Sequence, residues 1–539
     1  MKKVLFNGKI YVNKDHFAQA VCFEDEVILK VGGNDEVLAF AGDCEKTDLE
    51  GKTVIPGLND SHQHVSMIGE HMAQAAIIGS SSIDEVIARC KAFMAENPDL
   101  CKDGVRATGW NQDLFTTGEK RYLNRHDLDK ISTEVPVVLS RICGHILAAN
   151  TKAIEMAGLG IGSPQIEGGT FGLEADGYPD GFFSEFATGV VSALIPGLSD
   201  DQVEALTLKA MDYCVSHGLT SIQSNDIGQC SIGDEKTFAM FQRIYSGDGG
   251  KVRYHHQLCF RTADDFRAFL KGEFKNGVYK RPNWLNIGCL KLFKDGSLGA
   301  RTATTRNEYL DDPGNFGVEA MSAALMDEMI GLAAENGMQV ITHAIGDKAI
   351  SDMLDSYEKV LVDGKNPLRH SIVHYQCVDE AIIDRTAKMG VLAQAQPIFL
   401  TTDIHAVPSR FPEEMNRWFL AFKSYLAKGV TVAFGSDSPV EDCNPFLSLY
   451  CAVTRKDVSG YPDAGFFPEE CIDVATAIDC FTVGSAYAEF QEDIKGRIQE
   501  GMLADMLILD RDIFTCDPME IRDILPLETI VGGKTMYKA

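Results

Sequence analysis

Eight strand-like runs, separated in most intervals by helical patterns, constrain the fold of this chain more than any other feature. The runs are rich in β-branched and aromatic residues and are bounded by Gly, Asn and Asp. A chain that alternates strands with helices builds a parallel sheet, and eight repeats predict an α/β fold, a (β/α)8 barrel of the TIM type. The runs occupy residues 53–60, 219–224, 252–258, 287–293, 338–344, 370–376, 390–396 and 430–436.

The interval between the first two runs breaks this rhythm. It holds about 155 residues, far more than one helix needs. We therefore expect an inserted subdomain at 75–198 within a barrel of residues 56–489. Loops that follow barrel strands build the active-site face, so this insertion should fold over the site.

Both ends of the chain consist of short predicted strands separated by turn residues. Neither end can bury a core alone, whereas the two together can, and chain ends often lie close to each other. The sequence therefore predicts one small β-sandwich made from residues 1–55 and 490–539.

The composition disfavours some classes of partner. With 50 basic and 78 acidic residues the formal net charge is −28, and so acidic a surface repels the phosphate backbone of nucleic acids. No segment approaches the roughly 20 consecutive apolar residues of a membrane span, and the start of the chain lacks the apolar segment of a secretory signal. The 15 cysteines include no CxxC pair, which is typical of reduced thiols in a cytoplasmic protein. We expect a small-molecule substrate and leave a homodimer open.

The pair His62 and His64 is the strongest sign of chemistry. Both lie in PGLNDSHQH, where the first run ends, and the two-residue period of a strand points both imidazoles to one face. At the carboxyl end of a barrel strand that face borders the active site. Neighbouring neutral imidazoles suit a divalent ion such as zinc, although a chance HxH near a turn would also explain the pair taken alone.

Further candidate ligands lie at the ends of other runs. His343 ends VITH, His374 ends SIVH, Asp437 ends VAFGSD, and Lys291 lies within CLKLFKDGS. Because the carboxyl ends of barrel strands meet on one face, these side chains should converge there. A single histidine at a strand end is usually structural, but this combination predicts a metal site.

These motifs resemble those of the amidohydrolase superfamily of metal-dependent hydrolases. PGLNDSHQH, HAIGD, GSDSPV and KGRIQEGMLADMLILD match its motifs in order, and the resemblance covers nearly the whole chain. Three further stretches resemble the amidohydrolase-3, YtcJ-like branch, which includes N-substituted formamide deformylases. They are GWNQDLF at 109–115, RICGH at 141–145 and KLFKDGSLGARTA at 291–303.

The resemblance implies a role for each candidate ligand. His62 and His64 would hold the more buried metal ion, and His343 and His374 would hold the other. Asp437 would bind metal and act as the general base. Zinc, as two ions, is the first expectation, although similar ligands also serve manganese, iron and cobalt.

Lys291, carbamylated by CO₂, would bridge the two ions as a carboxylate. An unmodified lysine is a cation that would repel the metal, so it must be neutral or converted. The period of two places Lys291 on the same face as Cys289 and places Lys294 on the opposite face, which favours Lys291. A structural ion pair of Lys291 with Asp295 is the alternative explanation.

Two positions depart from the pattern of the branch. Val373 precedes His374 where a Glu is common, and Cys143 precedes the Gly-His of RICGH where an Asp is common. Neither change removes a ligand, but both can alter the shape of the pocket and the choice of substrate.

Five residues outside the ligand set are candidate substrate contacts. Four lie in the insertion, and the fifth follows the fourth run in a Gly-rich loop, where an arginine can bind a carboxylate or carbonyl group. A packing or loop-fixing role explains each of them equally well. They are Trp110, Gln112, Arg141, His145 and Arg301.

The resemblance implies hydrolysis of a small acyclic amide at an N-formyl, N-acyl or carbamate C–N bond. A water activated by the metal would attack the carbonyl carbon, and Asp437 would accept its proton and deliver it to the leaving nitrogen. Two alternatives stay open. A single-metal deaminase of the same superfamily would need a Glu near the fifth run, where His343 is followed by Ala-Ile-Gly, and a non-catalytic scaffold would have lost ligands, all six of which are present.

Overall fold

The computed structural model describes residues 1–142, 145–247, 249–274 and 281–539. The chain divides into two compact units. One consists of Met1–Ile68 together with Thr207–Ala539, and the other consists of Gly69–Leu206. The larger unit contains the barrel strands and both ends of the chain, so all six candidate ligands belong to it.

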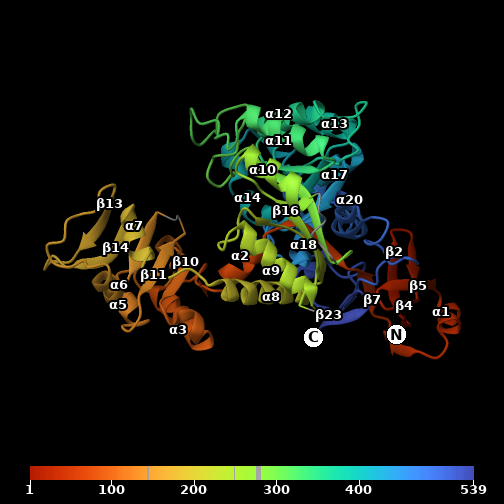
Figure 1. The fold of residues 1–539 in the computed structure, drawn as a ribbon, viewed down its shortest axis with the longest axis horizontal. Helices are drawn as coiled ribbons and strands as arrows, with labels where there is room; N and C mark the ends of the chain where they lie inside the picture. The colour runs from red at the N-terminus through yellow and green to blue at the C-terminus, as the bar shows by residue number, and fades with distance from the viewer. Residues whose placement is uncertain (143–144, 248, 275–280) are drawn as a thin grey trace. The chain divides into compact units, whose positions relative to one another are not determined.

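Eight strands, each parallel to its neighbours, form a sheet that is nearly closed into a barrel (Figure 1). This arrangement confirms the predicted fold class. In order around the sheet the strands are β8 (Leu58–Gln63), β15 (Leu219–Ile227), β16 (Arg253–Leu258), β17 (Leu285–Phe293), β18 (Val340–Ala344), β19 (Ser371–His374), β20 (Leu392–Ala395) and β21 (Val432–Phe434).

Helices alternate with these strands along the chain. In α13, for example, the Asp379 side chain accepts the N–H of Ile382 at the start, and Gly390 ends the helix in the left-handed conformation, with φ 68°. Such caps supply partners for backbone groups that the helix itself leaves unpaired. The main helices of the barrel are α8 (Asp200–Ser216), α9 (Asp234–Ser246), α10 (Ala263–Phe269), α11 (Ala323–Glu335), α12 (Asp347–Glu358), α13 (Glu380–Met389), α17 (Phe422–Ala427) and α18 (Pro445–Thr454).

The first predicted run, 53–60, is two strands rather than one. β7 (Thr53–Pro56) belongs to a sheet of the chain ends, and β8 begins the barrel after Gly57. A Cβ at Gly57 would lie only 2.2 Å from Oγ1 of Thr220. Glycine is therefore required where the chain passes from one sheet to the other against β15.

Two further sheets are built from the ends of the chain. One has the order β5 (Val27–Gly32), β4 (Ala20–Glu24), β1 (Lys2–Phe6) and β6 (Glu45–Asp48). In the other, N-terminal and C-terminal strands share one sheet, and Figure 1 shows them side by side in red and blue. Residues from both ends, such as Ile10, Val21, Met506 and Ile530, share one buried core. The order of the mixed sheet is β24 (Lys534–Lys538), β23 (Pro526–Val531), β22 (Met506–Leu509), β7, β2 (Lys9–Asn13) and β3 (His16–Ala18).

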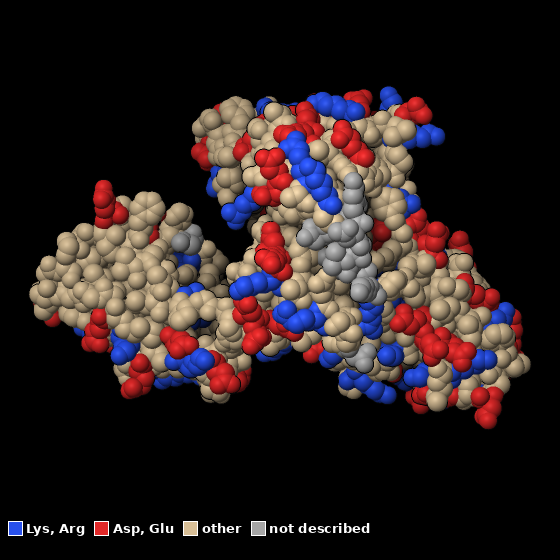
Figure 2. All heavy atoms as spheres, in the orientation of Figure 1, with Lys and Arg blue, Asp and Glu red and all other residues tan. Residues whose placement is uncertain are grey.

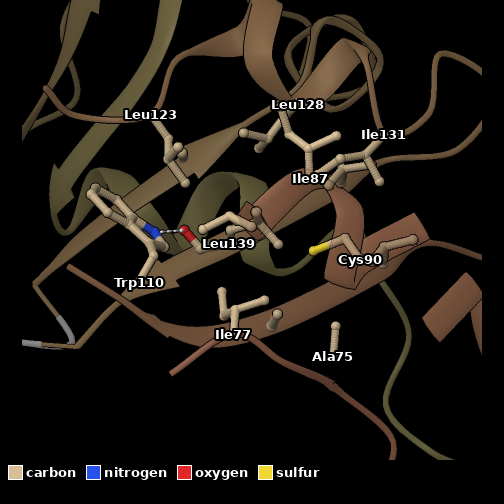
Figure 3. Packing of buried hydrophobic residues seen from close by; sticks show 14 of the residues in the cluster. Ala75, Ile77, Ile87, Cys90, Trp110, Leu123, Leu128, Ile131 and Leu139 are labelled. Atoms are coloured by element: carbon tan, nitrogen blue, oxygen red, sulfur yellow. Dashed lines mark hydrogen bonds between the residues drawn. The ribbon is translucent and has the colours of Figure 1, made fainter. Parts of the chain in front are cut away.

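The smaller unit has its own six-stranded sheet and its own core. Side chains of α3 (Ile83–Glu96), such as Ile87 and Cys90, pack in this core with Trp110 and Leu139 (Figure 3). A unit with a separate buried core can be treated as a domain. The order of its sheet is β13 (Gly169–Leu173), β14 (Pro179–Glu185), β12 (Ile146–Ala149), β11 (Val137–Arg141), β10 (Val105–Trp110) and β9 (Ala75–Ala76).

Charged side chains of both signs are interspersed over the visible face of the molecule (Figure 2). Acidic residues outnumber basic ones in the chain, 78 to 50. Within the part of the chain that the structure describes, no helix is long and apolar enough to cross a membrane.

A buried polar network lies at the amino ends of the barrel strands. The Glu489 carboxylate is 2.6 Å from Nζ of Lys495 and accepts a 2.6 Å hydrogen bond from the Asn59 amide. Nδ1 of His255 lies 3.3 Å from the second oxygen of Glu489, and Nζ of Lys495 also contacts Oγ of Ser221. All five side chains are buried. A buried charge is tolerated only with its partner present, so the network should contribute to the stability of this end of the barrel.

We predict that Glu489→Gln lowers the free energy of unfolding by about 3–5 kcal/mol, because it leaves the Lys495 ammonium buried without a counter-charge. Adding Lys495→Met should recover part of this loss, since the unpaired charge is then removed. Urea denaturation followed by circular dichroism measures both effects.

The matched control is Glu492→Gln, which breaks the partly exposed ion pair with Arg369, whose two side chains are 28% and 17% exposed. A pair of this kind contributes about 0–1 kcal/mol. An equal decrease in the free energy of unfolding for Glu489→Gln and Glu492→Gln would contradict the proposed importance of burial.

Candidate metal centre

His62, His64 and Asp437 form the most compact group of potential metal ligands in the described residues. His62 lies in β8, His64 follows its end, and Asp437 lies just beyond β21. Oδ1 of Asp437 is 3.2 Å from Nε2 of His62 and 3.2 Å from Nε2 of His64. The ligand atoms of the three residues all lie within 4.8 Å of one another. One ion could contact all three side chains.

Contacts across the seam between β8 and β21 create this proximity. The Asp437 N–H donates to the His62 carbonyl at 2.7 Å, and the His64 N–H donates to the Ser438 carbonyl at 2.8 Å. A Cβ at Gly435 would lie 2.7 Å from the His62 nitrogen, so only glycine allows this approach. The first and last strands of the barrel thus meet where the ligands lie.

Asp60 reinforces the seam. Oδ1 accepts the N–H of His62 at 3.0 Å and that of Ser436 at 3.1 Å, while Oδ2 accepts the Ser436 hydroxyl at 2.5 Å. The side chain is fully buried. One carboxylate therefore holds both segments that carry the ligands.

His343 and His374 form a second pair beside this group. They lie at the carboxyl ends of β18 and β19, and their ring centroids are 4.3 Å apart. The His374 ring lies 5.9 Å from the His62 ring, centroid to centroid. The four imidazole rings therefore lie close to one another.

Lys291 lies among these ligands, and Lys294 does not. Nζ of Lys291 is 3.0 Å from Nε2 of His62, and the residue has no exposed surface. Nζ of Lys294 instead lies 3.3 Å from Glu319 and 3.5 Å from Asp352.

The Asp295 carboxylate accepts hydrogen bonds from backbone groups. It accepts the backbone N–H groups of Thr304, Ile345 and Gly346. These bonds account for its carboxylate without an ion pair to Lys291 and fix the loop after β17 against the end of β18.

Each of the four histidines uses one ring nitrogen in a hydrogen bond to a carbonyl-type oxygen. Nδ1 of His64 donates to the Asn225 carbonyl at 2.8 Å, and Nε2 of His343 donates to the Gly296 carbonyl at 3.0 Å. Nδ1 of His62 and Nδ1 of His374 are bonded to the side-chain oxygens of Gln257 (2.5 Å) and Gln396 (2.9 Å). A neutral ring that donates from one nitrogen has a lone pair on the other. Three histidines thus present Nε2, and His343 presents Nδ1.

Burial keeps three of the imidazoles neutral. It lowers the pKa of His62 to about 3, with the Lys291 charge adding to the effect, and lowers that of His343 to about 4. Burial also holds the pKa of His374 well below its ordinary value.

The donor set therefore fits a divalent cation. With Nδ1 of His62 donating to Gln257, its Nε2 lone pair faces a carboxylate oxygen of Asp437 at 3.2 Å. A divalent cation held by both groups would satisfy this lone pair, and the Lys291 ammonium 3.0 Å away is the other cation that can. Neutral imidazole and carboxylate are ligands that zinc and related ions accept.

Val373, where the branch commonly has Glu, packs in a small apolar cluster with Cys289 and Ile341. Val373 therefore adds no carboxylate at the position where the branch commonly has one. Cys143, the other departure, lies outside the described residues.

The five predicted substrate contacts have structural partners in the described part of the chain. The Arg301 guanidinium forms two hydrogen bonds with Asp311, at 3.0 and 2.6 Å, which fixes its loop. Nε of Arg141 donates to the Gln112 side chain at 2.9 Å, so these two residues are brought together. His145 is largely exposed and lies 3.2 Å from Glu185.

Trp110 is a core residue of the smaller unit. Its side chain is 1% exposed, and the indole N–H donates to the Leu139 carbonyl at 2.9 Å (Figure 3). This placement gives Trp110 a packing role. Contact of Trp110, Gln112, Arg141, His145 or Arg301 with a substrate stays a prediction.

Four residues of the site were missed in the sequence. Each lies at or near the carboxyl end of a barrel strand, on the side of the ligands, so position in the strand was the available signal. They are Asp60, Asn225, Gln257 and Gln396.

Comparison with known proteins agrees with this geometry. A family model described as amidohydrolase family matches residues 45–537. The chain is 31% identical over 543 residues to the putative amidohydrolase YtcJ of Bacillus subtilis (strain 168), covering 100% of both chains. It is 25% identical to an N-substituted formamide deformylase of Arthrobacter pascens, covering 97% of this chain and 95% of that protein. The crystal structure of an uncharacterized metal-dependent hydrolase from Pyrococcus horikoshii OT3 superimposes with a TM-score of 0.76 at 25% identity, covering 96% and 99% of the two chains.

We predict that Asp60→Ala loses metal although Asp60 is not among the proposed ligands. The segments that carry His62 and Asp437 would lose the carboxylate that accepts hydrogen bonds from both of them. Each buried donor left unpaired costs about 1–3 kcal/mol. Elemental analysis after dialysis measures the metal content, and circular dichroism checks the fold.

The control is Asp505→Ala. Asp505 is also buried and accepts hydrogen bonds from Arg253 at the amino end of β16. This variant should lose stability and keep its metal. Full metal content in both variants would contradict a role of Asp60 in the seam.

Proposed function

Because the chain belongs to the amidohydrolase family and is a metal-dependent hydrolase, we propose that it cleaves the C–N bond of a small acyclic amide. N-formyl, N-acyl and carbamate compounds are the proposed substrates. The observation that carries the proposal is the carboxylate of Asp437 facing the free nitrogens of two histidines at 3.2 Å. The formamide deformylase among the relatives supports the choice of substrate class.

Five side chains, together with Lys291, would hold the metal. His62, His64 and Asp437 would bind one divalent ion, and His343 and His374 would bind a second. When bound, such ions lower the pKa of water and polarise a carbonyl group. Zinc is the proposed ion, since buried imidazole and carboxylate groups suit it.

Asp437 is the proposed general base. An aspartate carboxylate is ordinarily ionised at neutral pH and can accept a proton. Its buried position next to His62 and His64 supports this role. After accepting the proton, the same carboxylate delivers it to the leaving nitrogen, so that the amine departs neutral.

A screen of N-formyl, N-acetyl and carbamate derivatives of simple amines, read out by amine release, tests the proposal. We expect turnover with at least one class and two metal ions per chain. One ion together with ammonia release from an amino-substituted ring would favour a deaminase, and a protein that binds no metal would favour a scaffold.

With the substrate found by the screen, Asp437→Asn should reduce kcat by at least the roughly 10²–10⁴-fold that general acid–base catalysis contributes, because asparagine keeps the size of the side chain but cannot accept the proton. The circular dichroism spectrum should stay unchanged. A kcat like that of the wild type would exclude the proposed role.

Lys291 is the proposed bridge between the two metal ions. Burial lowers its pKa to about 8, against the opposing effect of Asp437. A neutral amine can attack CO₂, which forms a carbamate and releases one proton. The product is an anion with two oxygens, in the place where an ammonium group would repel divalent ions.

We predict that Lys291→Ala loses metal and activity, and that a short carboxylic acid in the buffer partly restores both by occupying the vacated space. Lys294→Ala is the matched control, since its ammonium pairs with Glu319 and Asp352 outside the ligand group. Intact-protein mass spectrometry with and without bicarbonate tests the modification. The assignment is wrong if Lys294→Ala, and not Lys291→Ala, removes the metal.

A further inference from the structure

Gln257 fixes the orientation of His62. The amide of Gln257, in β16, donates to the Ser61 carbonyl at 2.8 Å. This bond settles which end of the amide is which, because a carbonyl oxygen can only accept. The Gln257 oxygen must then face Nδ1 of His62, 2.5 Å away, and Nδ1 must carry the proton. Nε2 of His62 is left with its lone pair toward Asp437 and Lys291.

Gln396 does the same for His374. It lies just beyond β20, and its amide nitrogen donates to the Gln394 carbonyl at 3.3 Å. Its oxygen is 2.9 Å from Nδ1 of His374. Gln257, Gln396 and the two histidines are all buried, so water does not compete for these hydrogen bonds.

We propose that Gln257 and Gln396 are positioning residues of the metal centre: each holds a histidine in the one tautomer and orientation that presents Nε2 to the ion. Without the glutamine oxygen, a buried neutral imidazole can move its proton to Nε2, which cannot then bind a metal. The two glutamines come from different strands and act on different members of the ligand set. Their effects should therefore be separable.

The amide suits this task for a second reason. It accepts the imidazole proton without adding charge to a site that already contains the Asp437 carboxylate. A carboxylate in the same place would add a negative charge, but it would also make the imidazole more basic and therefore a stronger metal ligand than the amide does. The inference rests on the proposed metal-dependent function, but it concerns residues that no family motif in this chain includes.

The experiment measures Zn²⁺ affinity of the full-length protein by competition with a chromophoric chelator, without any substrate. We expect Gln257→Met and Gln396→Met each to weaken Zn²⁺ binding by about 10–100-fold, since methionine fills the space but cannot accept the imidazole proton. Gln396→Glu restores an acceptor, and it should bind Zn²⁺ at least as tightly as the wild type.

Gln339→Met is the matched control. Gln339 is buried, and its amide donates to the Arg369 and Ala488 carbonyls, but it contacts none of the proposed ligands. This variant should lose stability without losing Zn²⁺ affinity.

The possible results test the proposed function and the positioning role of the glutamines separately. A wild-type protein that binds no Zn²⁺ or other divalent ion overturns the proposed function. A wild type that binds the ion, with unchanged affinity in both glutamine-to-methionine variants, overturns only this inference. If one of the two methionine variants fails to fold, the Zn²⁺ affinity of the other still tests the inference. The inference also fails if Gln396→Glu binds Zn²⁺ as weakly as Gln396→Met.

Discussion

The metal centre depends on the seam where β8 meets β21. Neither strand end could hold a site alone, because His62 and His64 belong to one and Asp437 to the other. Two backbone hydrogen bonds and the Asp60 carboxylate join these segments. Closure of the barrel at this point brings residues 375 positions apart into contact. The entropic cost of closing so long a loop is offset only by the packing of the whole barrel.

Charged side chains inside the barrel are paired at one end and left without a lysine or arginine partner at the other. At the base, Glu489 and Lys495 neutralise each other at 2.6 Å. Above them, Cys289, Ile341 and Val373 form an apolar layer. At the mouth, Asp437 has no lysine or arginine within ion-pair distance in the described residues, and it faces imidazole nitrogens instead. A paired charge contributes to stability, whereas a charge left for an ion contributes to binding.

The sequence was most informative where periodicity and turn residues act locally. Seven of the eight predicted runs match single barrel strands, and His62, His343 and His374 lie where strand ends predicted them. The first run was misjudged, because residues 53–56 and 58–63 have the same β character and differ only in the sheet that each joins. Gln257 and Gln396 were missed, since ordinary polar residues share their position near the strand ends and nothing else in the sequence marks them.

The sequence by itself determined the α/β class and the strand character of both chain ends, because these follow from residue type and spacing along the chain. It also supplied the candidate ligands, through motifs that resemble those of the family. The tertiary structure decided which side chains share a site and in what state. The approach of Asp437 to His62, the free nitrogen of each imidazole and the neutral state of the buried rings all depend on neighbours from other strands. Such contacts join residues hundreds of positions apart, and only the closed barrel fixes their distances and excludes the water that would otherwise screen them.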